Sequence, residues 1–167
     1  MGDAYLSEYS TRLLYIYFAE VTLGLIFFFI FRHFGNLYRR RFLITWSLSW
    51  MAYAIYMGTS GFVFVFLIKT QSWFRDSLSI IAQLACFLQI IMILRGTYEL
   101  IYERAFSKGK FRLIFFASFA IALISVLSFG QAGPFSRYLV SFGSRAVITG
   151  IGFLVAGIVV WTNKKFS

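Results

Sequence analysis

Five apolar stretches, each long enough to cross a lipid bilayer as an α-helix, account for most of this chain of 167 residues. They lie at about 13–31, 42–68, 78–94, 111–129 and 139–161. A membrane-spanning helix needs roughly 17 to 25 mostly apolar residues, because backbone polar groups inside the bilayer must bond within the segment. Only 13% of the residues are charged, too few to cover a water-facing surface. The sequence therefore predicts an all-α membrane protein, a single transmembrane domain over 1–167 built as a five-helix transmembrane bundle.

Lysine and arginine are shared unequally between the two predicted sides of the membrane. One side carries 11 of them and the other carries four. The richer side holds Arg32, Arg39, Arg40, Arg41, Arg95, Arg104, Lys108, Lys110, Arg112, Lys164 and Lys165. Because short basic loops stay in the cytoplasm, this distribution predicts an N-terminus outside and a cytoplasmic C-terminus.

The formal net charge of +10 does not indicate a nucleic-acid partner, because the basic residues lie in short loops between apolar spans. Cys86 is the only cysteine, His33 is the only histidine, and the carboxylates do not cluster. These residues offer no metal site and no catalytic acid, base or nucleophile set. We therefore expect no enzyme activity in this chain, no cofactor, and the lipid bilayer as its main partner.

Two charged residues lie inside predicted spans, Glu20 in the first and Arg145 in the last. Both spans run from outside to inside, which places each residue roughly 10 Å below the outer boundary. A charge at this depth is costly unless it is paired, faces a cavity or serves a function. We therefore predict an intramembrane charge pair. In a structural role, the pair would fix the register of two helices, or Arg145 would instead extend to the outer headgroups. In a functional role, it would respond to a ligand or a proton.

Further polar residues fall in the same outer half of the membrane. They are Thr59, Ser60, Gln83 and Gln89. Hydrogen bonds between helices explain such residues in many membrane proteins. Their shared depth with Glu20 also fits a polar pocket that opens to the outside.

The second span presents an aromatic face made by Trp46, Trp50 and Tyr53, which are spaced by four and three residues. This spacing puts the three rings on one side of a helix. Such a face is typical of packing against another helix, and a flat apolar ligand is the alternative.

Residues 38–53 (YRRRFLITWSLSWMAY) combine a basic loop with a span that carries two tryptophans. This segment resembles the N-terminal membrane regions of bacterial sensor histidine kinases and diguanylate cyclases. Residues 94–98 (LRGTY) are similar to the Gly-x-Tyr exit of those regions, and residues 148–157 (ITGIGFLVAG) to their later glycine-containing span. The resemblance implies a multi-pass sensory input module of the cell inner membrane, which signals to a cytoplasmic histidine kinase or cyclase domain. It implies no catalytic residue in this chain.

Two other functions remain open on the sequence alone. The chain could be a structural or accessory subunit of a larger integral membrane complex, with aromatic surfaces against partner helices. A small transporter or channel is the weaker alternative, because the spans show no internal repeat and no continuous polar path. Small residues in the last span fit either contacts within the chain or a homodimer.

Overall fold

The structure, a computed structural model, describes residues 2–66 and 73–129 and single positions further on. Within this part the chain forms four helices, α1 (Gly2–Leu37), α2 (Arg41–Phe66), α3 (Trp73–Tyr102) and α4 (Lys108–Phe129). All four are long and apolar enough to cross a membrane. The single positions are Val147, Gly150, Ile151, Phe153, Leu154, Gly157, Ile158 and Trp161, and each is helical. The prediction of an all-α, membrane-type fold is thus confirmed for four helices, whereas the remainder of the fifth predicted span, 139–161, lies outside the described residues.

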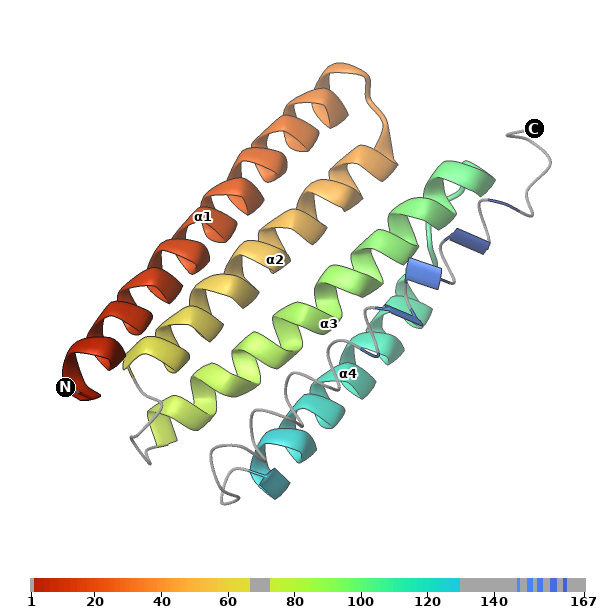
Figure 1. Ribbon diagram of the computed structural model, residues 1–167. Coiled ribbons are helices and arrows are strands. Elements are labelled where there is room, and N and C mark those ends of the chain that lie inside the picture. Colours follow the sequence, from red (N-terminus) through yellow and green to blue (C-terminus); the bar gives the residue numbers. More distant parts are fainter. Residues whose placement is uncertain are drawn as a thin grey trace.

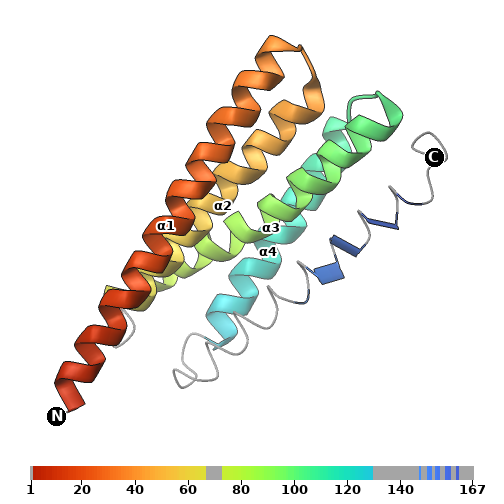
Figure 2. The same cartoon turned by 45° about the horizontal axis from the view of Figure 1, so that its top comes forward.

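The four helices lie side by side in an antiparallel row that follows the order of the chain (Figure 1). Each helix packs mainly against the next one in sequence. Most of the buried residues therefore belong to α2 and α3, which occupy the middle of the row. Figure 1 shows α1 and α4 on the two sides of this central pair, and in the turned view of Figure 2 α4 crosses α3. Both outer helices expose many large apolar side chains, as expected for surfaces that face lipid or other helices.

The helices extend beyond the predicted spans. The span predicted at 13–31 is part of α1, which continues to Leu37, and the span at 78–94 is part of α3, which continues to Tyr102. Backbone hydrogen bonds from residue i to residue i−4 do not require lipid, so a helix need not end at the edge of the hydrocarbon core. The extension of α3 past residue 94 is the part that carries Arg95 and Glu99.

The two described connections, 38–40 and 103–107, lie at the same end of the row (Figure 1). We call this the basic end, because Arg39, Arg40, Arg41 and Arg104 lie in or beside its connections. The sequence predicts that these two loops lie on the same side of the membrane, and the arrangement of the helices agrees with this.

Glycines let α1 and α2 approach closely. A Cβ added to Gly24 would lie 3.1 Å from the Ala54 Cβ, and one added to Gly61 would lie 2.7 Å from the Tyr17 ring. Small residues at such positions allow the backbones of membrane helices to pack tightly. This close contact brings the aromatic side chains of α2 against α1.

Candidate functional site

A buried polar cluster joins α2 to α3 near the basic end. The Thr45 hydroxyl donates a hydrogen bond of 2.6 Å to Glu99 Oε2, and Arg95 Nε donates one of 2.9 Å to Glu99 Oε1. The Glu99 side chain is only 4% exposed. A buried carboxylate is tolerated when both of its oxygens are bonded and its charge is balanced, and this cluster meets both conditions.

Local sequence explains why these side chains meet. Arg95 and Glu99 are four residues apart, so they share one face of α3 and form an ion pair along it. Thr45 lies four residues after the start of α2, opposite the last turn of the antiparallel α3. The Arg95 guanidinium carbon also lies 5.2 Å from the centre of the Phe111 ring of α4. Through Arg95, the cluster thus connects three helices.

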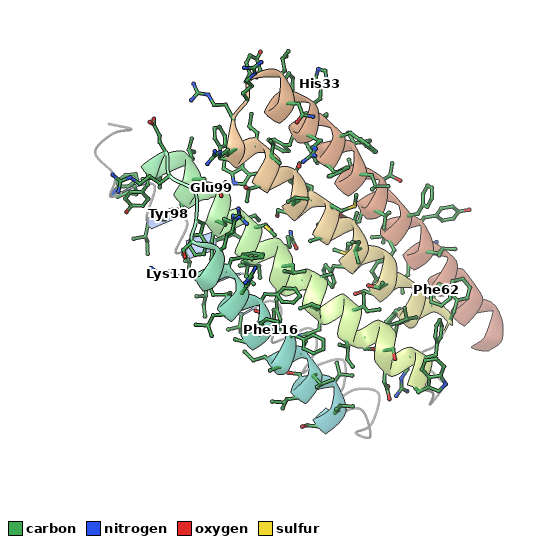
Figure 3. All side chains as sticks on the ribbon, turned by 180° about the vertical axis from the view of Figure 1, so that it is seen from behind. His33, Phe62, Tyr98, Glu99, Lys110 and Phe116 are labelled. Atoms are coloured by element: carbon green, nitrogen blue, oxygen red, sulfur yellow. The ribbon has the colours of Figure 1, made fainter. Side chains whose placement is uncertain are left out.

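A pocket of about 580 Å³ opens beside this cluster. Its lining residues are Arg39, Arg40, Arg41, Phe42, Glu99, Leu100, Glu103 and Arg104. Figure 3 shows Glu99 toward the same end of the molecule as His33, and Phe62 toward the other end. The pocket therefore belongs to the basic end, between the beginning of α2 and the end of α3.

A second polar contact joins α1 to α2 inside their membrane-length segments. The Tyr53 hydroxyl donates a short hydrogen bond to Glu20 Oε2, and both side chains are half-buried. Gly24, one turn after Glu20, makes room for the Tyr53 ring, since a Cβ there would lie 3.2 Å from Tyr53 Cδ1. Glu20 thus has a partner on the neighbouring helix. Arg145, the partner predicted from depth, lies outside the described residues.

Hydrogen bonds place two of the four residues of the predicted outer polar pocket, Thr59 and Gln89. Thr59 donates to the Ile55 carbonyl of its own helix at 2.7 Å. The Gln89 carbonyl accepts a 3.0 Å hydrogen bond from Ser49, which links α3 to α2. Gln83 is buried in α3, and Ser60 is half-buried in α2. The pocket formed by these residues stays a prediction.

The aromatic face of α2 packs against α1. The Trp50 and Phe27 ring centroids are 4.6 Å apart, and those of Trp46 and Phe31 are 6.0 Å apart. Tyr53 continues the same face and reaches Glu20. These contacts give the rings a packing role between helices. The Trp46 Nε1 atom is buried, and it has no hydrogen-bond partner within the described part of the chain.

Sequence reasoning missed the Thr45–Glu99 contact. The two residues are 54 positions apart, and Thr45 looks like an ordinary small residue in an apolar span. The available signal was the spacing of Arg95 and Glu99, which favours an ion pair on a helix. Among the residues that the structure describes, no group of three or more His, Cys, Asp or Glu side chains lies close enough together to hold a metal ion.

The arrangement can hold helices together through charge-assisted hydrogen bonds and can present arginines to an anion. The resemblance to sensor regions of histidine kinases and diguanylate cyclases stays a prediction that rests on short sequence segments. Comparison with protein-family models, with curated proteins and with solved structures found no match for this chain.

Proposed function

We propose that this chain is a sensory input module embedded in the cell inner membrane, which passes a signal to a cytoplasmic histidine kinase or diguanylate cyclase domain. The observation that supports it is the hydrogen bond between Tyr53 and Glu20 within two membrane-length helices. An ionisable side chain at membrane depth is costly, and its presence favours a functional role. A ligand or proton that changes the charge or partner of Glu20 would change the contact between α1 and α2.

Helix α2 would carry this change along the bundle. It contacts α1 through Tyr53 and α3 through Thr45, eight residues away, which corresponds to about 12 Å along the helix. A shift or rotation of α2 would therefore alter both polar contacts. A signal acts in this way only when it stabilises one packing of the helices over another.

The orientation in this proposal has the N-terminus outside and the basic end in the cytoplasm. The excess of arginine and lysine in the two connections supports this orientation. The cluster of Thr45, Glu99 and Arg95 then lies near the cytoplasmic face. A signal received near Glu20 would reach this cluster before it reached a cytoplasmic partner.

The test is to fuse the full chain to the output domain of a diguanylate cyclase and to measure production of its cyclic dinucleotide in membranes. We expect Glu20→Gln and Tyr53→Phe each to change the output about fivefold or more, the lower end of usual coupling between sites. Thr22→Val is the matched control, since Thr22 lies exposed on the same helix and bonds only to the Phe18 carbonyl. Circular dichroism checks that all variants fold. Outputs of the Glu20 and Tyr53 variants equal to those of wild type and of the control would overturn the proposal.

An accessory subunit of a larger membrane complex is the second candidate. The observation that favours it is the exposed aromatic surface of α1, an edge helix, where Tyr15, Phe18 and Phe29 are 65–71% exposed. Aromatic side chains are common where membrane helices meet partners as well as lipid. Purification in mild detergent distinguishes the two functions. A partner in fixed stoichiometry supports the subunit, and a monomer or homodimer excludes it.

A further inference from the structure

We propose that the pocket at the basic end binds the phosphate headgroup of an anionic lipid. This inference does not depend on the sensory function proposed above. It rests on the charge, the backbone geometry and the position of the residues that line the pocket.

The charge balance of the pocket favours an anion. Its lining contains four arginines and two glutamates. Glu99 is already bonded by Arg95 and Thr45, and Arg95 is not part of the lining. The charge of Glu99 is therefore balanced from outside the pocket, and little of it is left to balance the arginines of the lining. Glu103 alone then faces four guanidinium groups. Within the described ranges, none of the four has an ion pair or side-chain hydrogen bond. They are the Arg39, Arg40, Arg41 and Arg104 groups, and planar guanidinium groups suit phosphate oxygens.

The backbone at the start of α2 adds to this preference. The first turn of α2 begins at Arg41 and contains no acidic residue. Its unbonded N–H groups and the helix dipole attract negative charge, and the arginines supply an independent reason for an anion at the same place. The Arg40 amide donates a 3.1 Å hydrogen bond to the Gly35 carbonyl, which fixes the connection from α1 into α2. Arg39, Arg40 and Arg41 are thus presented from an ordered turn.

The apolar part of the lining points to a lipid as the source of the phosphate. Phe42 and Leu100 lie among the charged residues of the pocket. Phe42 also packs on Trp46, with ring centroids 5.3 Å apart, and so continues into the apolar body of the bundle. The pocket therefore has charge at the ends of the helices and apolar surface next to the membrane-length segments. Basic pockets between transmembrane helices at this level suit lipid headgroups.

The size of the pocket fits the same occupant. A volume of about 580 Å³ exceeds what one inorganic phosphate ion fills, and it lies in the usual range of small-molecule sites. A glycerophosphate headgroup with the first part of its acyl chains would occupy both the charged and the apolar surfaces.

The test uses the full chain in detergent and measures lipid binding by native mass spectrometry. The lipid is phosphatidylglycerol, and phosphatidylcholine is the zwitterionic comparison. Arg40→Gln with Arg104→Gln removes two charges from the pocket. Lys108→Gln with Lys110→Gln removes the same charge from equally exposed positions at the same end that do not line the pocket. Glycerol 3-phosphate, added as a competitor, distinguishes a lipid from a soluble phosphate compound.

We expect the arginine pair to weaken phosphatidylglycerol binding about tenfold or more, because two charge-assisted contacts are lost. The lysine pair should change it less than about threefold, because neither lysine lines the pocket and an exposed charge outside the site has a weak effect. If the arginine pair and the lysine pair had equal effects, or if both lipids bound equally well, the pocket would not be the lipid-binding site. Full competition by glycerol 3-phosphate at concentrations similar to those of the lipid would overturn the lipid as the occupant. Circular dichroism of both double variants excludes misfolding as the cause.

Discussion

Gly96 of α3 leaves the space that the indole ring of Trp46 fills on α2. A Cβ added to Gly96 would lie 2.5 Å from Trp46 Nε1, which is far inside normal contact distance. Gly96 follows Arg95 and lies three residues before Glu99, so this close approach sets the spacing of α2 and α3 beside the polar cluster. The absence of a side chain at Gly96 thus allows the close approach of α2 and α3 beside the contact of Thr45 with Glu99.

Gly96→Ala should therefore destabilise the protein. The added methyl group must displace the Trp46 ring or separate the helices, and overpacking of this kind costs about 1–3 kcal/mol. The free energy of unfolding, measured by circular dichroism during titration with a denaturing detergent, gives the change. Gly109→Ala is the control, because its nearest neighbour would be Ser107 Oγ at 3.9 Å. A loss of stability in the control as large as in Gly96→Ala would contradict the role of close packing.

Two glycines of α2, one turn apart, should respond differently to the same substitution. A Cβ at Gly61 would lie 2.7 Å from Tyr17 Cγ, whereas one at Gly58 would lie 3.6 Å from Val21 Cγ2, an ordinary contact. We expect Gly61→Ala to lower the free energy of unfolding by about 1–3 kcal/mol. Gly58→Ala should be neutral or slightly stabilising, because alanine favours the helix. The same unfolding titration measures both, and equal losses would mean that α1 and α2 do not pack through Gly61.

The hydrogen bond between Thr45 and Glu99 predicts a measurable coupling energy. Thr45→Val and Glu99→Gln keep the shapes of the side chains and weaken the bond, and hydrogen bonds to charged groups contribute about 1.5–3 kcal/mol. A double-mutant cycle on the free energy of unfolding should give a coupling of about that size.

Thr59→Val combined with Glu99→Gln is the reference cycle for this experiment. Thr59 bonds to carbonyl groups of its own helix, so its change should add to that of Glu99 with a coupling below about 0.5 kcal/mol. Similar coupling in the two cycles would show that Thr45 has no special relation to Glu99.

The membrane helices could be predicted from the sequence because apolar length alone determines them. The sequence predicts a span over residues 42–68, and the structure has α2 over Arg41–Phe66, with 67 and 68 outside the described residues. The spacing of polar and apolar residues over 95–104 also predicts a short helical extension of the third span, and α3 continues to Tyr102. The partner of Glu99 could not be predicted: the last two turns of α3 contain Arg95 and Glu99, and Thr45 of α2 adds a hydrogen bond to their ion pair.

The hydrogen bond between Tyr53 and Glu20 illustrates a second limit, while the pair of Glu20 with Arg145 stays a prediction. Depth along the membrane normal follows from residue counting, and it placed Glu20 level with Arg145. Contact also depends on how each helix is rotated about its axis, which residue counting does not give. In the structure Gly24 lies against the Tyr53 ring, and with this rotation of α1 against α2 the Tyr53 hydroxyl reaches the Glu20 carboxylate. The spacing of the aromatic residues places Tyr53 on the aromatic face of α2, but nothing in the sequence indicates the hydrogen bond of its hydroxyl group.

The turn between α1 and α2 supports a last prediction. Arg39 has a φ angle of 52°, a left-handed conformation that side chains with a Cβ disfavour. It follows the end of α1 at the position where glycine is most common, in a turn closed by the bond from the Arg40 amide to the Gly35 carbonyl. Arg39→Gly should therefore be more stable than Arg39→Ala by about 0.5–1 kcal/mol, because glycine removes the strain while both variants lose the same charge. At Arg40, whose φ is not positive, Arg40→Gly should be less stable than Arg40→Ala, because glycine there only adds freedom to the unfolded chain. Unfolding titrations of the four variants measure both differences, and a glycine advantage of equal size at the two positions would mean that the turn stores no strain at Arg39.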